Sequence, residues 1–321
     1  MKKNLLFALL VSLAPITWSQ TDIALKINHR LNFADFALDM PAVNNLGQSY
    51  KTSRLEYYIS KFIIYHDGGI ETTVPLDVIA LVQPGEELST VIPLGNYDIT
   101  SVEQIQFSIG VYEPINNADP TLFDESHPLG PKSPSMHWGW AAGYRFVAYE
   151  GFGGADYSQN FQLHGLGNDN YFRQWQDVKS EMIDGTLILS LDANYTEALR
   201  DIDVSSGVVS HGETGAALKM LENFRDHVFG NYYASIADQE NELKWSVYPN
   251  PTVNGDITLT IESTENTTYS LQITNAVGQI IETIVIKNNQ PTPINLPVSG
   301  VYVISLFQNE LLIAQNKAIK L

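Results

Sequence analysis

The sequence predicts a mainly β protein: a β-sandwich body with one C-terminal amphipathic helix, followed by a small Ig-like β-sandwich domain. Short segments alternate apolar and polar residues and are separated by Gly, Pro, Asn and Asp, the pattern of sandwich strands. Only one stretch repeats its apolar residues at the helical period. Near residue 245 the composition changes, which indicates a second domain.

The strands of the body follow one another along the chain. The opening segment alternates Ile23, Leu25 and Ile27, which places His29 at the inward end of the same face. Further strands are predicted at 55–65, 74–82, 104–111, 144–149, 161–164 and 186–191, and the polar stretch 115–134 is predicted to be a loop. The helix is predicted over 214–228, where the apolar stripe consists of Ala217, Leu218, Leu221, Phe224 and Val228.

Four segments of the chain are expected from composition. Residues 1–19 have the form of a secretory signal peptide: Lys2 and Lys3 precede the apolar run 5–13, and Ser19 marks the cleavage site. The body occupies 20–230, a polar linker 231–244 and the second domain 245–321. No later stretch is apolar for long enough to be a transmembrane segment. We therefore expect a secreted or cell-surface protein that passes through the periplasm.

Charge and cysteine content exclude several classes of function. The 36 acidic residues outnumber the 18 Lys and Arg and give a formal net charge of −18. Such a chain repels phosphate backbones and anionic lipids, so we expect no nucleic-acid partner. The absence of cysteine excludes disulfides, thiol catalysis and cysteine metal sites. A transition-metal site in this chain must therefore use His, carboxylate, Met or a modified side chain.

The most distinctive stretch runs from Met136 to Gly151 and holds two tryptophans one residue apart. In an extended chain Trp138 and Trp140 share one face, whereas His137 lies on the other. From this spacing alone, burial of both indoles in the sandwich core is the default interpretation. Gly139 and Gly143 leave room for the close approach of another backbone or of a ligand.

This stretch resembles the central signature of the MbnP-like family, exported copper-binding proteins that work beside a di-haem MauG/MbnH-type enzyme. The resemblance extends over nearly all of the body. Its matching residues are Met136, His137, Trp138, Trp140, Gly143, Tyr144, Phe146, Glu150 and Gly151, with further pieces at His29-Arg30, Ser53-Arg54-Leu55, Tyr57–Ser60, Phe107–Val111, Asn116, Phe161, His164-Gly165, Asn223 and Phe229.

The resemblance implies a copper(I) site made by two histidines and a kynurenine that the di-haem enzyme produces from a tryptophan. His29 and His164 stand in the two histidine motifs of the family and are its implied ligands. Trp138 and Trp140 are both candidates for the modification, and His137 is a reserve ligand. An intact indole N–H has no lone pair to offer a metal, so binding and modification are expected to be coupled.

The other histidines and one methionine are weaker candidates. His66 beside a turn and His127 in a loop are expected to be solvated, and His211 lies just before the helix, either near the site or only near the helix N-terminus. Met136 is a soft donor, although a buried Met is usually a gap filler.

The second domain resembles the type A C-terminal sorting domain of the type IX secretion system, over residues 247–321. The resemblance rests on Tyr248-Pro249-Asn250-Pro251, the turn 275–278, Gly300-Val301-Tyr302 and the terminal strand around Lys317. It implies that the type IX machinery is a partner.

No catalytic motif accompanies these features, and we expect no enzyme activity. The alternative function is a secreted carbohydrate-binding or adhesive β-sandwich, stabilised by calcium. In it Trp138, Trp140, Tyr144 and Trp175 would stack on sugar rings, and the Asn/Asp loops would supply oxygen ligands.

Overall fold

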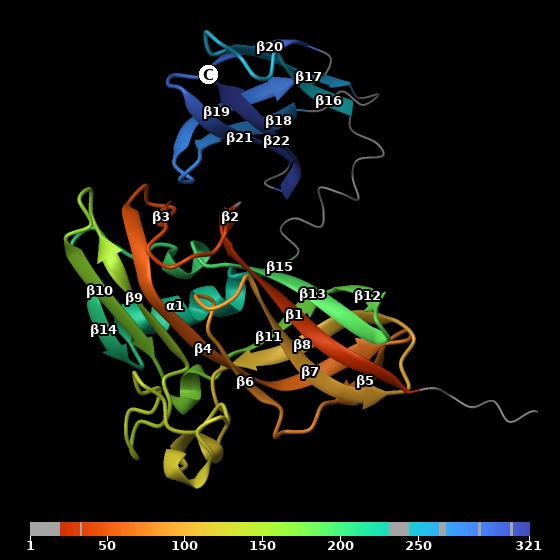
Figure 1. Cartoon of the computed structure of the whole chain (residues 1–321), viewed down its shortest axis with the longest axis vertical. Helices are drawn as coiled ribbons and strands as arrows, with labels where there is room; N and C mark the ends of the chain where they lie inside the picture. The colour runs from red at the N-terminus through yellow and green to blue at the C-terminus, as the bar shows by residue number, and fades with distance from the viewer. Residues whose placement is uncertain (1–19, 33, 231–243, 263–267, 288–289, 309–310) are drawn as a thin grey trace, which may run out of the picture.

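The computed structural model of the chain describes residues 20–32, 34–230, 244–262, 268–287, 290–308 and 311–321. The expected signal peptide, 1–19, and nearly all of the expected linker therefore lie outside the described residues. In Figure 1 the N-terminal body runs from red to green, and the C-terminal domain is drawn in blue. Strands are the main element in both, so the predicted mainly β fold with sandwich-like sheets is confirmed.

The first sheet of the body is organised around strand β1, Thr21–Leu31. Its residues Ile23, Leu25 and Ile27 are buried, as the alternation predicts. β1 pairs in parallel with β13 and antiparallel with β7 and the short β2. The remaining strands of this sheet are β2 (Ala34–Asp35), β7 (Ser89–Tyr97), β12 (Lys179–Ile183), β13 (Thr186–Asn194) and β15 (Phe229–Gly230).

The second sheet is organised around β4, Ser49–His66, which is long enough to pair with several strands in succession. β9 pairs with one half of β4, and β8 with the other. Beyond β9 the sheet continues through β10 to β14, which is parallel to β10. The partners are β3 (Pro41–Val43), β5 (Ile70–Thr73), β6 (Ile79–Val82), β8 (Val102–Ile109), β9 (Val147–Gly153), β10 (Gln159–Gly165), β11 (Arg173–Asp177) and β14 (Val209–Gly212).

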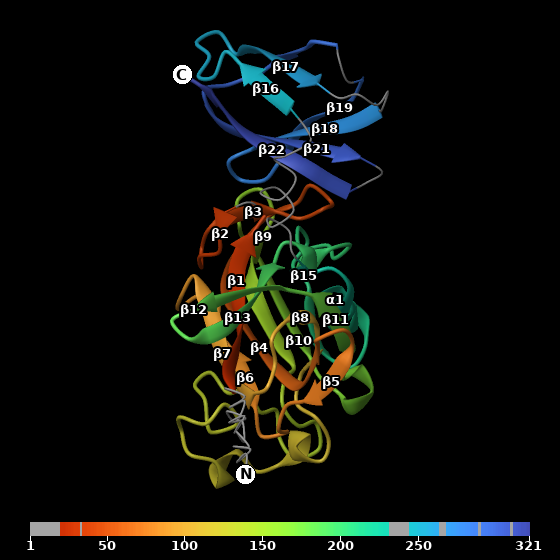
Figure 2. The ribbon, with the colours of Figure 1, turned by 90° about the vertical axis from the view of Figure 1, so that its right-hand side faces the viewer.

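Helix α1, Gly215–Asp226, packs beside β10 and β14 (Figures 1 and 2). Its buried apolar residues are Ala217, Met220, Leu221 and Phe224. The contact is close: a Cβ on Gly165 of β10 would lie 2.5 Å from the Leu221 side chain. Short 3-10 turns occur at Ile115–Asn117 (η1), Pro120–Leu122 (η2), Asn168–Asn170 (η3) and Glu197–Leu199 (η4).

The C-terminal domain has two antiparallel sheets. One contains β16 (Lys244–Tyr248), β17 (Asp256–Glu262) and β20 (Thr292–Asn295). The other contains β18 (Thr268–Asn275), β19 (Ile280–Lys287), β21 (Gly300–Gln308) and β22 (Leu311–Lys320). The alternating residues Ile257, Leu259 and Ile261 of β17 are buried in a core shared with Leu271 and Ile304. This arrangement is the small sandwich that the alternation predicts.

Candidate functional site

The tryptophan segment forms a tight turn and not the start of a strand. The Trp138 N–H donates to the Gly143 carbonyl at 2.8 Å, and the Gly143 N–H donates to the Gly139 carbonyl at 2.9 Å. Gly139 and Gly143 both have positive φ, 111° and 72°. A Cβ on Gly143 would lie 2.6 Å from the Asn116 carbonyl oxygen, so the expected close backbone approach occurs at this glycine.

Neither indole fills the sandwich core, because the turn carries both toward the surface. Trp138 is 39% exposed and Trp140 is 66% exposed. Residues alternate between the two faces of a strand only within regular strand structure, which begins at Val147 of β9. Before β9 the segment makes only an isolated bridge between His137 and Tyr144, so Trp138 and Trp140 do not share a strand face. The default interpretation of buried indoles is therefore wrong for this chain.

Trp138 lies against two histidines and an arginine, which together we call the Trp138 cluster: Trp138, Arg145, His164 and His211. The indole meets the His164 ring edge-on at a centroid distance of 5.5 Å and the His211 ring at 5.0 Å. The Arg145 guanidinium carbon lies 4.2 Å from the indole centroid, within the range of a cation–π contact. The cluster thus joins two imidazoles, an indole and a cation.

The two histidines meet because β10 and β14 run in parallel with His164 and His211 as register partners. Their rings stack at a centroid distance of 4.2 Å and an interplanar angle of 10°. His211 is exposed, whereas His164 is buried. Partial burial and the neighbouring His164 and Arg145 lower the pKa of His211, which favours its neutral form.

His164 is held through one ring nitrogen only. Its Nε2 lies 2.8 Å from the Glu150 Oε1, whereas its Nδ1 is buried and has no hydrogen-bond partner among the described residues. The hydrogen bond from His164, with help from Arg54, lowers the pKa of Glu150 to about 2, so Glu150 is a carboxylate and only accepts. Nε2 therefore carries the proton, and in the neutral ring Nδ1 has a free lone pair.

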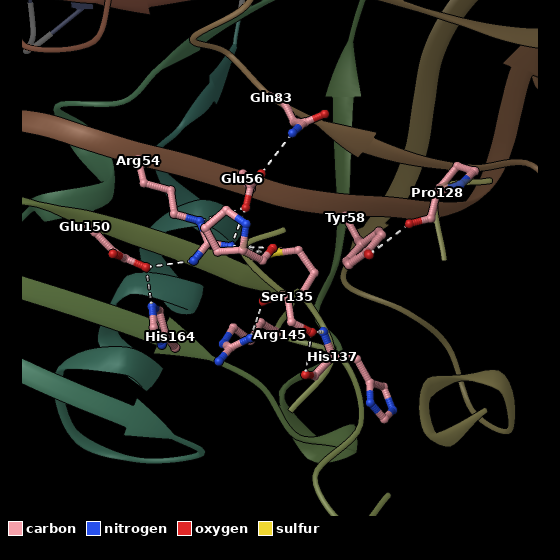
Figure 3. A network of polar contacts seen from close by, with 12 residues as sticks. Arg54, Glu56, Tyr58, Gln83, Pro128, Ser135, His137, Arg145, Glu150 and His164 are labelled. Atoms are coloured by element: carbon pink, nitrogen blue, oxygen red, sulfur yellow. Dashed lines mark hydrogen bonds and ion pairs between the residues drawn. The ribbon is translucent and has the colours of Figure 1, made fainter. Parts of the chain in front are cut away.

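Figure 3 shows the network behind this contact. Arg54 Nη1 donates to Glu150 Oε1 at 2.8 Å, and Arg54 Nε donates to Glu56 Oε2 at 2.7 Å. The Gln83 side-chain amide donates to the other Glu56 oxygen at 2.8 Å. The polar chain from Gln83 to His164 is continuous, and Arg54 and Glu56 are both largely withdrawn from solvent.

Residues 20–213, more than half of the chain, match the family model described as MbnP. This chain belongs to the MbnP family. Residues 246–320 match the secretion system C-terminal sorting domain, so this MbnP-family protein is exported to the cell surface or beyond by type IX secretion.

Among solved structures the chain is similar to MbnP from Methylosinus trichosporium. The two are 16% identical, the match covers 62% of this chain and 82% of that chain, and the TM-score is 0.41. No curated protein matches the chain. None of the helices in the described ranges has both the length and the apolar character needed to cross a membrane.

His29, the other expected ligand of this MbnP domain, lies apart from the Trp138 cluster. It is fully buried, with Nδ1 at 2.7 Å from the Tyr195 hydroxyl and Nε2 at 2.9 Å from the Thr90 hydroxyl. Burial, reinforced by the neighbouring Arg30, lowers the pKa of His29 to about 4. Both nitrogens are therefore occupied by core hydrogen bonds.

Strand β4 separates His29 from His164. Tyr57 of β4 contacts Tyr195, which holds His29, so this face of β4 looks into the core between the two sheets. Glu56, one residue earlier, points to the opposite face and belongs to the network that holds His164. The structure thus brings His164 together with Trp138 and His211, and it does not bring His29 to them.

The rings of His137 and Trp140 contact each other. The His137 ring contacts Tyr144 at 4.9 Å and Trp140 at 6.3 Å, and its Nδ1 accepts the Gly139 N–H. No ring contact of Trp140 with His164 or His211 occurs in the described residues. The reserve ligand and the second tryptophan are therefore neighbours of each other and not members of the Trp138 cluster.

Three other expectations are resolved by burial and contacts. Met136 is buried, and its sulfur lies 3.4 Å from an Arg54 nitrogen. His66 is buried between Asp67 and Thr72, so the expectation that it is solvated is wrong. His127 is half-buried and stacks on Phe123.

Sequence reasoning misses Arg145 as a member of the cluster and gives His211 only as a weaker candidate. His211 stands in a four-residue strand with no clear alternation, and its position follows only from the parallel pairing with β10. Across the described ranges no three His, Cys, Asp or Glu residues gather closely enough to hold a metal ion. A metal at the cluster would accordingly need a donor beyond the two histidines.

Proposed function

We propose that this exported MbnP-family protein binds copper(I) at the Trp138 cluster, with His164, His211 and a kynurenine derived from Trp138 as ligands. The observation that carries the proposal is the buried Nδ1 of His164, which has no hydrogen-bond partner in the described residues and lies in a ring beside a second imidazole and an indole. Copper(I) accepts few ligands and favours imidazole and soft donors.

The residues present supply two of the three donor atoms proposed for the ion, and the third lone pair is missing. His164 offers one nitrogen with its tautomer already set, and the lowered pKa of His211 keeps a second imidazole neutral. The Trp138 indole lies against both rings but has only a donor N–H. Conversion of this indole to an aryl amine would supply the third lone pair.

The conversion is an oxidation that requires a partner. The indole C2–C3 bond breaks, one oxygen is added to each of these carbons, and hydrolysis releases C2 as formate, which leaves kynurenine with a free aryl amine. We propose a di-haem MauG/MbnH-type enzyme as catalyst, with two peroxide molecules as oxidant that are reduced to two waters. Trp138 is 39% exposed, so an enzyme docked on this face can reach it.

Trp138 is the better of the two candidate tryptophans. Its ring contacts both His164 and His211, whereas the Trp140 ring contacts His137. A kynurenine at position 140 would lie beside His137, without the ring contacts to His164 and His211 that Trp138 makes. The geometry favours modification at position 138.

The test is peptide mass mapping of protein from its native host, paired with metal analysis of the same sample. We expect the mass shift of kynurenine at Trp138, and stoichiometric copper that is lost in His164→Ala and in His211→Ala. His127→Ala is the matched control, because the His127 ring stacks on Phe123 in a loop and is not a proposed ligand. This variant should retain copper. Intact Trp138 in copper-free native protein would refute the proposal.

Exposed Trp140 and Trp175 favour the alternative, a carbohydrate-binding module. A stacking platform needs rings that lie together on one face. Trp175 instead donates from its indole to the Tyr65 hydroxyl at 3.4 Å, and no contact joins it to Trp138 or Trp140 in the described residues. A glycan array with Trp140→Ala as the comparison tests this alternative.

A further inference from the structure

Glu150 occupies a special place in the second sheet, because it contacts the proposed ligand His164 without being a ligand itself. On β9 it is the register partner of Arg54 on β4 and of Gln162 on β10. His164 stands two residues beyond Gln162 and so projects from the same face of the sheet. Glu150 and His164 are diagonal neighbours, a separation that long side chains bridge.

The contact sets the tautomer of His164. A carboxylate accepts hydrogen bonds and cannot donate, so the imidazole must present a proton at Nε2. The other nitrogen, Nδ1, is buried and has no partner in the described part of the chain. A proton placed on Nδ1 instead would leave a buried donor without an acceptor and would break the contact to Glu150, both of which are costly.

Glu150 is itself held in place from β4. The same Oε1 atom that meets His164 also accepts from Arg54, and Arg54 is oriented by a second carboxylate, Glu56, on the next position of the same face. Gln83 completes the chain by donating to Glu56. Figure 3 shows these side chains linked one to the next from Gln83 to His164.

We propose that Glu150, fixed by Arg54, is a positioning residue that holds His164 as the Nε2–H tautomer and reserves Nδ1 as its single donor atom for a metal. The inference deepens the proposed function and rests on it for the identity of the metal. The positioning role itself concerns the metal-free protein. Outer carboxylates that receive the second N–H of a ligand histidine commonly orient the ring and raise its basicity.

The experiment reads the tautomer directly in the metal-free full chain. Long-range proton–nitrogen correlation spectra of protein labelled in its histidine rings distinguish protonated from unprotonated ring nitrogens, and the His164→Gln spectrum identifies the His164 signals. We expect one tautomer, with the proton on Nε2. In Glu150→Gln we expect both tautomers, because an amide can either accept from Nε2–H or donate to an unprotonated Nε2.

Glu56→Gln is the matched control. Glu56 lies on the same sheet face and contacts the same Arg54, but it does not touch His164. A general role of the network in holding the strands together would make both variants change the His164 spectrum alike. The positioning role changes it in Glu150→Gln alone. Glu150→Ala repeats the test without any acceptor, and Glu150→Gln retains the side-chain size should the alanine variant fail to fold.

Copper(I) affinity, measured by competition with a chromophoric chelator, gives the second reading. We expect Glu150→Gln to weaken binding by about 10- to 100-fold, the usual effect of removing an outer hydrogen-bond partner of a metal ligand. Glu56→Gln should change it far less. An unchanged tautomer in Glu150→Gln, or an Nδ1–H tautomer in the unmutated protein, would overturn the inference. Absence of copper binding by unmutated protein that carries kynurenine at position 138 would instead refute the proposed function.

Discussion

Acidification provides the sharpest test of the role that the structure gives to His29. The side chain is fully buried, and both ring nitrogens hydrogen-bond to neutral hydroxyl groups, those of Tyr195 and Thr90. Such a site accommodates a neutral imidazole and disfavours a charged one. Burial, with a smaller contribution from Arg30, accordingly lowers the pKa of His29 from 6.5 to about 4.

The free energy of unfolding must then fall as the pH falls between these two values. Above a pH of about 7.5 His29 is essentially unprotonated in both the folded and the unfolded state, and the residue contributes no pH dependence. Between the two pKa values the unfolded chain binds a proton that the folded chain rejects, so unfolding is favoured. The loss amounts to about 2 kcal/mol at pH 5 and about 3 kcal/mol at pH 4.

Urea unfolding at a series of pH values measures this loss. Carboxylates and other histidines also titrate in this range, so the result is the difference between the unmutated protein and His29→Gln, which cannot titrate at this position. We expect the variant to be less stable at neutral pH because a core hydrogen bond is lost. Between about pH 7.5 and pH 5 its stability should fall by about 2 kcal/mol less than that of the unmutated protein.

Parallel pH profiles for the two proteins would refute this reasoning. So would a His29 pKa near 6.5 in an NMR titration, because it would mean that the ring reaches solvent or an anion. Copper analysis of the same variant is independent of the profile. If His29→Gln folds at neutral pH and keeps its copper, His29 acts in the core and not as a ligand.

Three further outcomes follow from local geometry. Gly143→Ala should destabilise the turn by more than about 1 kcal/mol in thermal unfolding, because it combines positive φ with a contact of 2.6 Å to the Asn116 carbonyl, and a normal melting temperature would contradict this. Gly165→Ala should cost about 1–3 kcal/mol and loosen α1 in hydrogen exchange, since its Cβ would overlap Leu221. Because hydrogen bonds from His164 and Arg54 lower the pKa of Glu150 from 4.5 to about 2, its contribution to stability should be lost progressively as the pH falls from about 5 to about 2, whereas its carboxylate band in an infrared titration of the folded protein should persist to about pH 3.

The strands that could be predicted are those with clean alternation. Ile23, Leu25 and Ile27 identify β1, and Ile105, Phe107 and Ile109 identify β8. β7 is not predicted, because Pro93 and Gly95 interrupt its alternating pattern. In the structure both residues are accommodated where the pairing of β7 with β1 is irregular. The strand predicted at 74–82 is shorter in the structure, since a turn precedes β6.

The tryptophan segment shows the opposite error, since a pattern typical of a strand belongs to a turn. Trp138 and Trp140 have the spacing of residues on one strand face, but Gly139 between them has positive φ and Gly143 closes the loop. Backbone conformation at two glycines therefore decides where the indoles lie. The sequence marks both glycines as permissive without stating which conformation they take.

From the sequence alone follow the mainly β class, the sorting domain, the absence of any cysteine chemistry and a set of candidate site residues, His29, His164, Trp138 and Trp140. Tertiary structure decides which residues stand beside them. His211 reaches His164 only through the parallel pairing of β10 with β14, a contact between segments 47 positions apart that local pattern does not encode. His29 is removed from the cluster by the alternation of β4, in which Glu56 and Tyr57 point to opposite faces. Periodicity fixes the face on which a side chain lies relative to its own strand, but the partners across that face are set by how distant strands pair.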